Sequence, residues 1–291
     1  MKEITIISGK GGTGKTSIVA SFAALAENKI LADCDVDAAD LHLVLNPRVK
    51  YTESYSGSKA ARIDPEKCTE CGLCRDLCRF DAIGEDFVVY GFSCEGCGLC
   101  YNACPEGAVL FEDRKSGDWY ISETDYGPMV HAKLGIAEEN SGKLVSVVRG
   151  EARRIAEEKN LDLIIVDGSP GIGCPVIASV TGSDLLLVIT EPTLSGIHDL
   201  ERVVKLADHF DIPVLVCVNK YDINEEMTDR IAKYCEENNR RLAGKIPYDA
   251  VVTKAQIAGV SVVEYSSSKV SKEIEKLWRH VCYNLPAEST A

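Results

Sequence analysis

A glycine-rich run near the start of the chain, residues 9–16, has the residue types of a phosphate-binding loop. It reads G-K-G-G-T-G-K-T, follows a short apolar run and opens a helical pattern. The glycines let the backbone bend so that successive N–H groups face phosphate oxygens, and the following helix start adds partial positive charge. Lys15 would reach the β- and γ-phosphates, and the Thr16 hydroxyl would bind Mg²⁺. The expected nucleotide contacts come from Gly11, Gly12, Thr13, Gly14, Lys15, Thr16 and Ser17.

Eight of the thirteen cysteines stand in two matched runs of the form C-x₂-C-x₂-C-x₃-C. The pattern resembles that of bacterial two-cluster ferredoxins, in which the first three cysteines hold one cluster and the fourth crosses to the other. Zinc sites instead use C-x₂-C pairs with long spacers, which disfavours a zinc ribbon. One [4Fe–4S] cluster is therefore expected on Cys68, Cys71, Cys74 and Cys104, and the other on Cys94, Cys97, Cys100 and Cys78.

Carboxylates follow two apolar runs at the points where strands are expected to end. Asp33 and Asp35 close the first run, and Asp167 closes the second, at residues 163–166. Ligands bind beyond the carboxyl ends of strands in open α/β sheets, so these side chains are placed to act on bound phosphate. The second run has the Walker B form, in which Asp167 would hold Mg²⁺ through water. An ordinary acidic turn, with Asp37 capping the next helix, is the alternative for the first.

The elements that must position these residues alternate along most of the chain. Strand-length apolar runs are separated by helical patterns, one of which follows Asn140 or Ser141 as its cap. This alternation predicts an α/β fold with a doubly wound, mainly parallel sheet. The composition changes to cysteine-rich and glycine-punctuated at 60–112. We expect a discontinuous P-loop domain of residues 1–59 and 113–291, with a small α+β ferredoxin domain inserted at 60–112.

Lys10, directly after the first glycine of the loop, narrows the class of phosphate-binding loop further. The loop resembles the deviant Walker A loop of the MinD/ParA superfamily, and nearly the whole chain resembles its members in the CobQ/CobB/MinD/ParA nucleotide-binding domain family. The resemblance implies that two subunits sandwich two nucleotides, with Lys10 reaching the partner's phosphates. It assigns Asp35 to the attacking water and Asp33 to the Mg²⁺ shell. Lys10, Lys15 and Asp35 are thus the expected catalytic residues, with a solvated loop lysine as the alternative for Lys10.

Two later segments are expected to contact the base of the nucleotide. Asn219 ends an apolar run, and its amide can hydrogen-bond a base edge. In the MinD superfamily the equivalent asparagine reads adenine, with help from a loop that residues 246–249 resemble. The resemblance therefore implies ATP or ADP as the nucleotide, with Pro247 and Asp249 beside the adenine. An asparagine that merely fills a turn is the alternative.

Cys174 stands seven residues after Asp167, a spacing similar to that of a cluster ligand in the nitrogenase iron protein. There the cluster bridges two subunits. The sequence offers no second cysteine between the insert and Asp167 to complete such a site. A small buried or redox-sensitive thiol is the alternative for Cys174.

Bulk properties restrict the compartment and the partners. The formal net charge of −13 argues against nucleic acid, which needs a basic footprint. Apolar runs are too short for a membrane span, and the last helix, 270–285, is expected to pack on the body, so membrane association is not expected. Many cysteines without a visible export signal suggest metal binding in a reducing cytoplasm.

Together these features predict an ATP-binding and ATP-hydrolysing iron–sulfur protein. We expect an ATP-dependent homodimer, or a heterodimer with a paralogue, whose nucleotide state gates electron transfer through two [4Fe–4S] clusters to or from a partner protein. The insert carries four Lys and Arg against ten Asp and Glu, which suits a basic redox partner. The alternatives are an iron–sulfur cluster carrier ATPase and a MinD-type positioning switch.

Overall fold

The computed structural model describes residues 1–135 and 141–286, and the described chain divides into two compact units. The first unit comprises Met1–Thr52, Trp119–Lys133 and residues 141–286. The second comprises Glu53–Asp118 with residues 134 and 135. The cysteine-rich stretch 60–112 lies inside the range of the second unit. The expected capping residue Asn140 lies outside the described residues.

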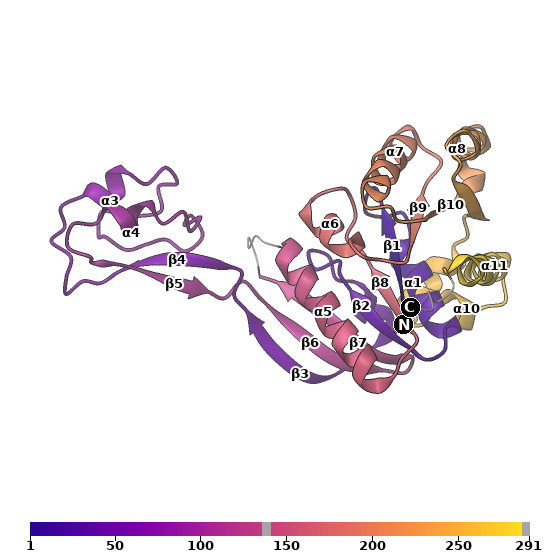
Figure 1. The fold of residues 1–291 in the computed structure, drawn as a ribbon, viewed down its shortest axis with the longest axis horizontal. Coiled ribbons are helices and arrows are strands. Elements are labelled where there is room, and N and C mark those ends of the chain that lie inside the picture. Colours follow the sequence, from indigo (N-terminus) through magenta and orange to yellow (C-terminus); the bar gives the residue numbers. More distant parts are fainter. Residues whose placement is uncertain (136–140, 287–291) are drawn as a thin grey trace. The chain divides into compact units, whose positions relative to one another are not determined.

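The first unit is built on a sheet whose central strands are parallel (Figure 1). Every neighbouring pair from β11 to β7 runs parallel. The strand order is β11 (Arg241–Ile246), β10 (Val214–Asn219), β9 (Leu185–Thr190), β1 (Lys2–Ser8), β8 (Leu163–Asp167), β2 (Lys29–Asp33), β7 (Gly127–Leu134), β6 (Gly117–Thr124) and β3 (Arg48–Tyr55). The prediction of a doubly wound, mainly parallel α/β sheet is therefore confirmed.

Helices cover both faces of this sheet (Figure 1). One face packs against α1 (Lys15–Leu25), α2 (Leu41–Leu45), α9 (Val251–Ile257), α10 (Val262–Tyr265) and α11 (Lys269–Asn284). The other packs against α6 (Cys174–Val180), α7 (Leu194–His209) and α8 (Glu225–Glu237), with α5 (Ser141–Lys159) beside α6. The strands are buried on both faces, which explains why β9 and β10 are continuous apolar runs.

The last helix, α11, packs on the body of the first unit. Its apolar residues recur at helical spacing, so they form one stripe that faces the sheet. The buried members of this stripe are Val270, Ile274, Leu277 and Val281. Trp278 extends the contact, because its ring centroid lies 4.8 Å from that of Phe22 on α1. In the described part of the chain, no helix combines the length and apolar character that crossing a membrane requires.

A buried ion network ties β1 to α5 and α6. The Arg149 guanidinium on α5 donates to the Glu3 carboxylate, and Arg153 donates to the other oxygen of that carboxylate at 2.7 Å. Arg149 also donates to the carbonyls of Ala178 and Thr181 at the end of α6. A buried charge is tolerated only when it is paired and hydrogen-bonded, and Arg149 meets both conditions.

The second unit repeats one local structure along the chain. It contains the antiparallel strands β4 (Ser58–Ile63) and β5 (Val109–Arg114) and the short helices α3 (Leu73–Asp76) and α4 (Leu99–Ala103). The two cysteine runs are offset by 26 residues, from Cys68 to Cys94. Three left-handed backbone positions recur at that offset: Glu70 and Gly96, Gly72 and Gly98, and Asp81 and Gly107. The sequence repeat is therefore also a repeat of backbone shape.

Candidate functional site

The glycine loop joins the end of β1 at Ser8 to the start of α1 at Lys15. Gly12 and Gly14 adopt left-handed backbone conformations, with φ of +78° and +84°. A side chain at Gly14 would also bring its Cβ within 2.4 Å of Asn219 Nδ2. Glycine is required there both by conformation and by space.

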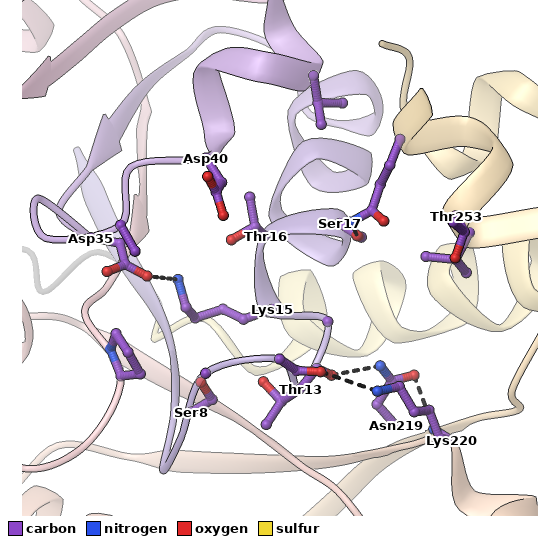
Figure 2. A pocket seen from close by; sticks show the side chains of 18 of the residues that line it. Ser8, Thr13, Lys15, Thr16, Ser17, Asp35, Asp40, Asn219, Lys220 and Thr253 are labelled. Atoms are coloured by element: carbon purple, nitrogen blue, oxygen red, sulfur yellow. Dashed lines mark hydrogen bonds and ion pairs between the residues drawn. The ribbon is translucent and has the colours of Figure 1, made fainter. Parts of the chain in front are cut away.

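The last residue of β10, Asn219, and the next residue, Lys220, hold the backbone of this loop. Asn219 Nδ2 donates to the Thr13 carbonyl at 2.7 Å, and Lys220 Nζ donates to the Gly12 carbonyl at 3.1 Å (Figure 2). In a trans peptide the N–H points opposite to the C=O. Holding these two carbonyls on one side therefore turns the N–H groups of Thr13 and Gly14 to the other side, as anion binding requires.

The Asn219 side chain makes two contacts that the sequence did not predict. Its Nδ2 bonds the loop, and its Oδ1 accepts from the Lys220 backbone N–H at 3.0 Å. Its side chain is thus used to brace the phosphate loop, and a contact with a base stays a prediction. Asn219 is nearly buried, as expected for a side chain that holds the backbone of the loop.

Lys15 lies at the centre of a buried cluster of charges. Its Nζ contacts the Asp167 carboxylate, and it lies 3.4 Å from Asp35 Oδ2 (Figure 2). Asp33 at the end of β2 is fully buried nearby, and one of its oxygens accepts from the Asp35 backbone N–H. The cluster therefore contains three carboxylates and one ammonium. A bound divalent cation would balance the excess negative charge.

The pKa values of these groups reflect burial and mutual repulsion. Burial, together with Asp167, raises the pKa of Asp33 well above its usual range. Burial also raises the pKa of Asp35 to about 6, although Lys15 opposes the shift. Burial alone would lower the pKa of Lys15, but Asp167 and Asp35 outweigh it and raise that pKa. The cluster thus lacks positive charge.

The polar atoms of this cluster fit a magnesium ion that is shared with phosphate. Asp33 Oδ2 and Asp167 Oδ2 are buried and have no hydrogen-bond partner, and Thr13 Oγ1 is in the same state. Thr13 and Thr16 line one cavity together with Asp35. Across residues 1–135 and 141–286, no three His, Cys, Asp or Glu side chains are placed to hold a metal ion by themselves. Protein sites bind Mg²⁺ through one or two carboxylates plus substrate phosphates, and Asp33 and Asp167 would supply such carboxylates.

A cavity of about 650 Å³ extends from the loop across to α9. That volume lies within the usual range for small-molecule sites. The expected residues Pro247 and Asp249 line it, and Asp249 Oδ1 accepts from the Val251 backbone N–H at 2.9 Å in the turn just before α9. Tyr248, from the loop 246–249, also lines the cavity, as does Gln256, which the sequence did not predict. The i, i+4 spacing of Val252 and Gln256 on α9 could have revealed that this helix faces the site.

Lys10 lies on the outer side of the loop. Its Nζ is 3.3 Å from Glu191 Oε2 and donates to Ser195 Oγ at 3.4 Å. Glu191 follows β9, and Ser195 lies in the first turn of α7. Lys10 is therefore not simply solvated, because it has partners within its own chain.

In the second unit the eight cysteines of the two runs line two separate cavities. All thirteen cysteines of the chain are free thiols. The lining of one cavity includes Cys68, Cys71, Cys74 and Cys104, and that of the other includes Cys78, Cys94, Cys97 and Cys100. The remaining walls are largely apolar, with Phe87 in the first and Phe111 in the second. In each cavity, three thiols come from one run and the fourth from the other.

The fourth thiol of each run is held in the same way. Cys78 Sγ accepts from the Ala82 backbone N–H at 3.4 Å, and Cys104 Sγ accepts from the Ala108 backbone N–H at 3.3 Å. Hydrogen bonds to ligand sulfurs stabilise negative charge and help to set the potential of a cluster. The donor chemistry of both cavities therefore fits iron–sulfur clusters, in which each iron takes its own thiolate.

Cys174 begins α6 and is exposed. The interpretation of this residue as a buried thiol is therefore wrong. The three cysteines Cys34, Cys217 and Cys235 are the buried ones outside the two runs, and burial raises the pKa of each. An exposed thiol at Cys174 is open to oxidation or to a partner.

Comparison with known proteins identifies the family. The sequence model of the CobQ/CobB/MinD/ParA nucleotide binding domain matches residues 4–262. This chain belongs to that family. An uncharacterized protein of Methanocaldococcus jannaschii is 36% identical over 280 residues, which cover 95% of each chain.

Two further proteins are similar to this MinD/ParA family member. The septum site-determining protein MinD of Pyrococcus horikoshii, solved in complex with Mg-ADP, has a TM-score of 0.59 at 19% identity and covers 99% of both chains. It shows that the fold is shared. An uncharacterized polyferredoxin-like protein of Methanocaldococcus jannaschii is 28% identical over 111 residues, which is 38% of this chain and 52% of that protein.

Proposed function

We propose that the protein is an ATP-hydrolysing iron–sulfur protein whose nucleotide state gates electron transfer through two [4Fe–4S] clusters. The observation that carries the proposal is the lining of the two cysteine cavities. Each combines three thiols of one run with the fourth thiol of the other, as a two-cluster ferredoxin requires. Residues 60–112, within the second unit, would then be a ferredoxin domain inserted into the P-loop domain formed by 1–59 and 113–291. The similarity to a polyferredoxin-like protein supports this assignment.

In the first unit, the loop residues would bind the phosphates of ATP. The inward N–H groups and Lys15 would hold the β- and γ-phosphates, and Lys15 would leave its carboxylate partners to do so. Thr16, Asp33 and Asp167 would hold Mg²⁺ directly or through water, and this ion would neutralise charge on the transferred phosphoryl group. The unpartnered oxygens of both carboxylates support this role.

Asp35 would orient the attacking water. It lines the same cavity, on the segment that follows β2. Lys10 would stabilise charge on the partner subunit's phosphates, so that hydrolysis requires an ATP-bound dimer.

In the second unit, the protein would supply thiolates, N–H···S hydrogen bonds and apolar walls to the clusters. Each bound cluster would accept or donate one electron at a time. Cys71 and Cys97, one from each cavity, are exposed, so both cavities come close to the surface where a redox partner could dock. Basic partners would suit the acidic charge of this unit.

The deciding experiment is a redox titration of anaerobically purified protein with ATP analogue, with ADP and without nucleotide. Iron and acid-labile sulfide would first be counted against protein. The proposal expects two four-iron clusters per chain and a potential or a partner affinity that depends on the bound nucleotide. Identical potentials and identical partner binding in all three states would contradict the proposed gating of electron transfer. Zinc in place of iron would contradict the assignment of a ferredoxin domain.

One observation favours an iron–sulfur cluster carrier as the second candidate. The exposure of Cys71 and Cys97 would give an acceptor protein access to a cluster ligand. Transfer to an apo-acceptor, followed by the gain of absorbance on the acceptor and its loss here, distinguishes the two. A gating protein should keep its clusters under these conditions.

A further inference from the structure

Glu191 links two lysines that contact the phosphate loop. Its Oε2 lies 3.3 Å from Lys10 Nζ, and its Oε1 contacts Lys220 Nζ. Lys220 in turn donates to the Gly12 carbonyl. One carboxylate at the end of β9 therefore holds the outer side of the loop at two points, Lys10 near its start and Gly12 in its middle.

The environment of Glu191 favours this double pairing. Its side chain is 14% exposed, against 29% for Lys220 and 37% for Lys10. A mostly buried carboxylate needs positive partners, and two lysines supply them. Lys220 adopts a left-handed backbone conformation with φ of +56°, which is uncommon for a residue with a side chain. That conformation follows directly on Asn219, which also braces the loop.

The three groups are unequal in how firmly they are held. Lys220 has the Gly12 carbonyl as well as Glu191, and Glu191 is anchored at the buried end of β9. Lys10 is more exposed, and its second contact is the exposed hydroxyl of Ser195. Lys10 is thus the member of the cluster that can leave at the lowest cost, and Glu191 would keep its pairing with Lys220 after Lys10 has gone.

We propose that Glu191 is a positioning residue that retains Lys10 on its own chain until a dimer forms around bound nucleotide. The inference rests on the proposed function, because Lys10 must reach the partner's phosphates. When a second subunit presents those phosphates, Lys10 exchanges Glu191 for them. Because the Lys10–Glu191 pair has to break first, Glu191 raises the free energy of forming the dimer. Without a partner, Lys10 stays paired with Glu191.

The test uses the full-length, cluster-loaded protein and measures two quantities. The first is the affinity of the monomer for Mg-ADP, which reports on the loop. The second is the dimer dissociation constant at saturating Mg²⁺ and a non-hydrolysable ATP analogue, measured by sedimentation. In Glu191→Gln, Lys10 is released, so the dimer should form more readily. Each half-exposed ion pair is worth about two- to fivefold in an equilibrium constant. A symmetric dimer has two such pairs, so the dimer constant should change by about four- to twenty-fivefold.

Three variants separate retention of Lys10 from a general loosening of the loop. Glu191→Asp keeps the charge and should restore most of the wild-type dimer constant. Lys220→Ala leaves the Lys10–Glu191 pair, so it should weaken Mg-ADP binding without strengthening the dimer. In a Lys10→Ala background, Glu191→Gln should produce no gain, because the retained group is absent.

The outcomes distinguish this inference from the proposed function. A wild-type chain that binds Mg-ADP and dimerises, with Glu191→Gln dimerising equally, would overturn the role of Glu191 alone. A gain that persists without Lys10 would also overturn it. A chain that neither binds nucleotide nor dimerises would overturn both. If Glu191→Gln fails to fold, Ser195→Ala removes the second contact of Lys10 and should strengthen the dimer about twofold, and no change would count against the proposal.

Discussion

The phosphate loop and the cysteine cavities hold their binding groups in different ways. In the loop, Lys15 is already paired with Asp35 and Asp167, so the charges that would meet a nucleotide meet one another. In the cavities, all eight thiols are free and stand among largely apolar walls. Their positions are set by the backbone, through short helices and left-handed turns that recur in both runs.

This difference predicts how each region responds to change. A site made of paired charges has to break those pairs before it binds, and it is left with a buried, uncompensated charge when one partner is removed. A site shaped by the backbone tolerates the loss of a single side chain better, but it depends on turns that only certain residues can adopt. The four predictions below test this contrast, from the largest expected effect to the smallest.

The largest effect is expected from Lys15→Ala. Removal of the ammonium leaves Asp35 and Asp167 facing the phosphates without compensation, so the affinity for Mg-ATP should fall by about 100-fold or more, or about 3 kcal/mol. Equilibrium binding of a fluorescent nucleotide measures it.

The matched control is the iron and sulfide content of the same variant. Because the two units form their sites from separate residues, both clusters should be retained. Loss of the clusters together with nucleotide binding would show that the two regions are not independent.

Paired cysteine substitutions test the crossed arrangement of the cavities. Cys68→Ser with Cys104→Ser removes two thiols from one cavity, so the protein should lose about half of its iron. Cys68→Ser with Cys78→Ser removes one thiol from each cavity, and both clusters should be weakened. Iron counting and electron paramagnetic resonance distinguish the two patterns.

Nucleotide affinity should stay within about twofold of wild type in both pairs, because no residue of the loop is touched. Equal iron loss from the two double variants would contradict the crossed assignment.

The third prediction compares matched turns within the cysteine repeat. Gly96 has a φ of +63°, and a Cβ there would lie 2.2 Å from the Lys59 carbonyl oxygen. Gly96→Ala should therefore destabilise the second unit by about 2–3 kcal/mol. Glu70 occupies the equivalent turn with a φ of +54°. Glu70→Gly relieves that conformation and should be neutral or stabilising by about 0.5 kcal/mol.

Thermal unfolding followed by cluster absorbance measures both variants. If Gly96→Ala were as stable as wild type, the backbone would not be what shapes this cavity.

The smallest effect concerns pH and the first unit. His131 on β7 is buried, bonds Ser122 Oγ at 2.8 Å, and stacks on Tyr120. Burial, with a contribution from His42, lowers its pKa to about 4. The unfolded chain therefore binds the proton more strongly, so stability present above about pH 6.5 should be lost as pH falls towards 4, by about 2 kcal/mol.

Urea unfolding at several pH values checks this, with His131→Gln expected to flatten the dependence. The exposed His209 provides the matched control, since His209→Gln should leave the slope unchanged. A wild-type slope in His131→Gln would show that other groups carry the acid sensitivity.

Local spacing was sufficient to predict several features of the molecule. The alternation of apolar runs and helical patterns predicted the parallel sheet, because strands buried on both faces must be continuously apolar. The spacing of the cysteines predicted which four thiols line each cavity, because a three-residue spacer turns the fourth thiol away from its own run. Both patterns can be recognised from residues that are close together in the sequence.

Contacts between distant segments could not be predicted in this way. Lys220 reaches Gly12 across 208 residues, and Gln256 donates to Ser17 Oγ across 239. These contacts depend on the order of strands in the sheet, which places the ends of β1, β9 and β10 side by side. For the same reason the bond from the Asn219 amide to the loop was not predicted, and its contact with a base stays a prediction. The second unit begins at Glu53, because β4 and β5 extend beyond the cysteine-rich stretch.

The arginine shared by Glu3 and the last turn of α6 has a consequence for motion. Arg149 fastens the carboxyl end of this helix to the first strand, while its amino end follows Gly171, with a φ of +93°, and Gly173. A short helix that is held at one end can move most at the other end. Any rearrangement of the segment after Asp167 would therefore swing Cys174 through the widest arc and leave Thr181 nearly still.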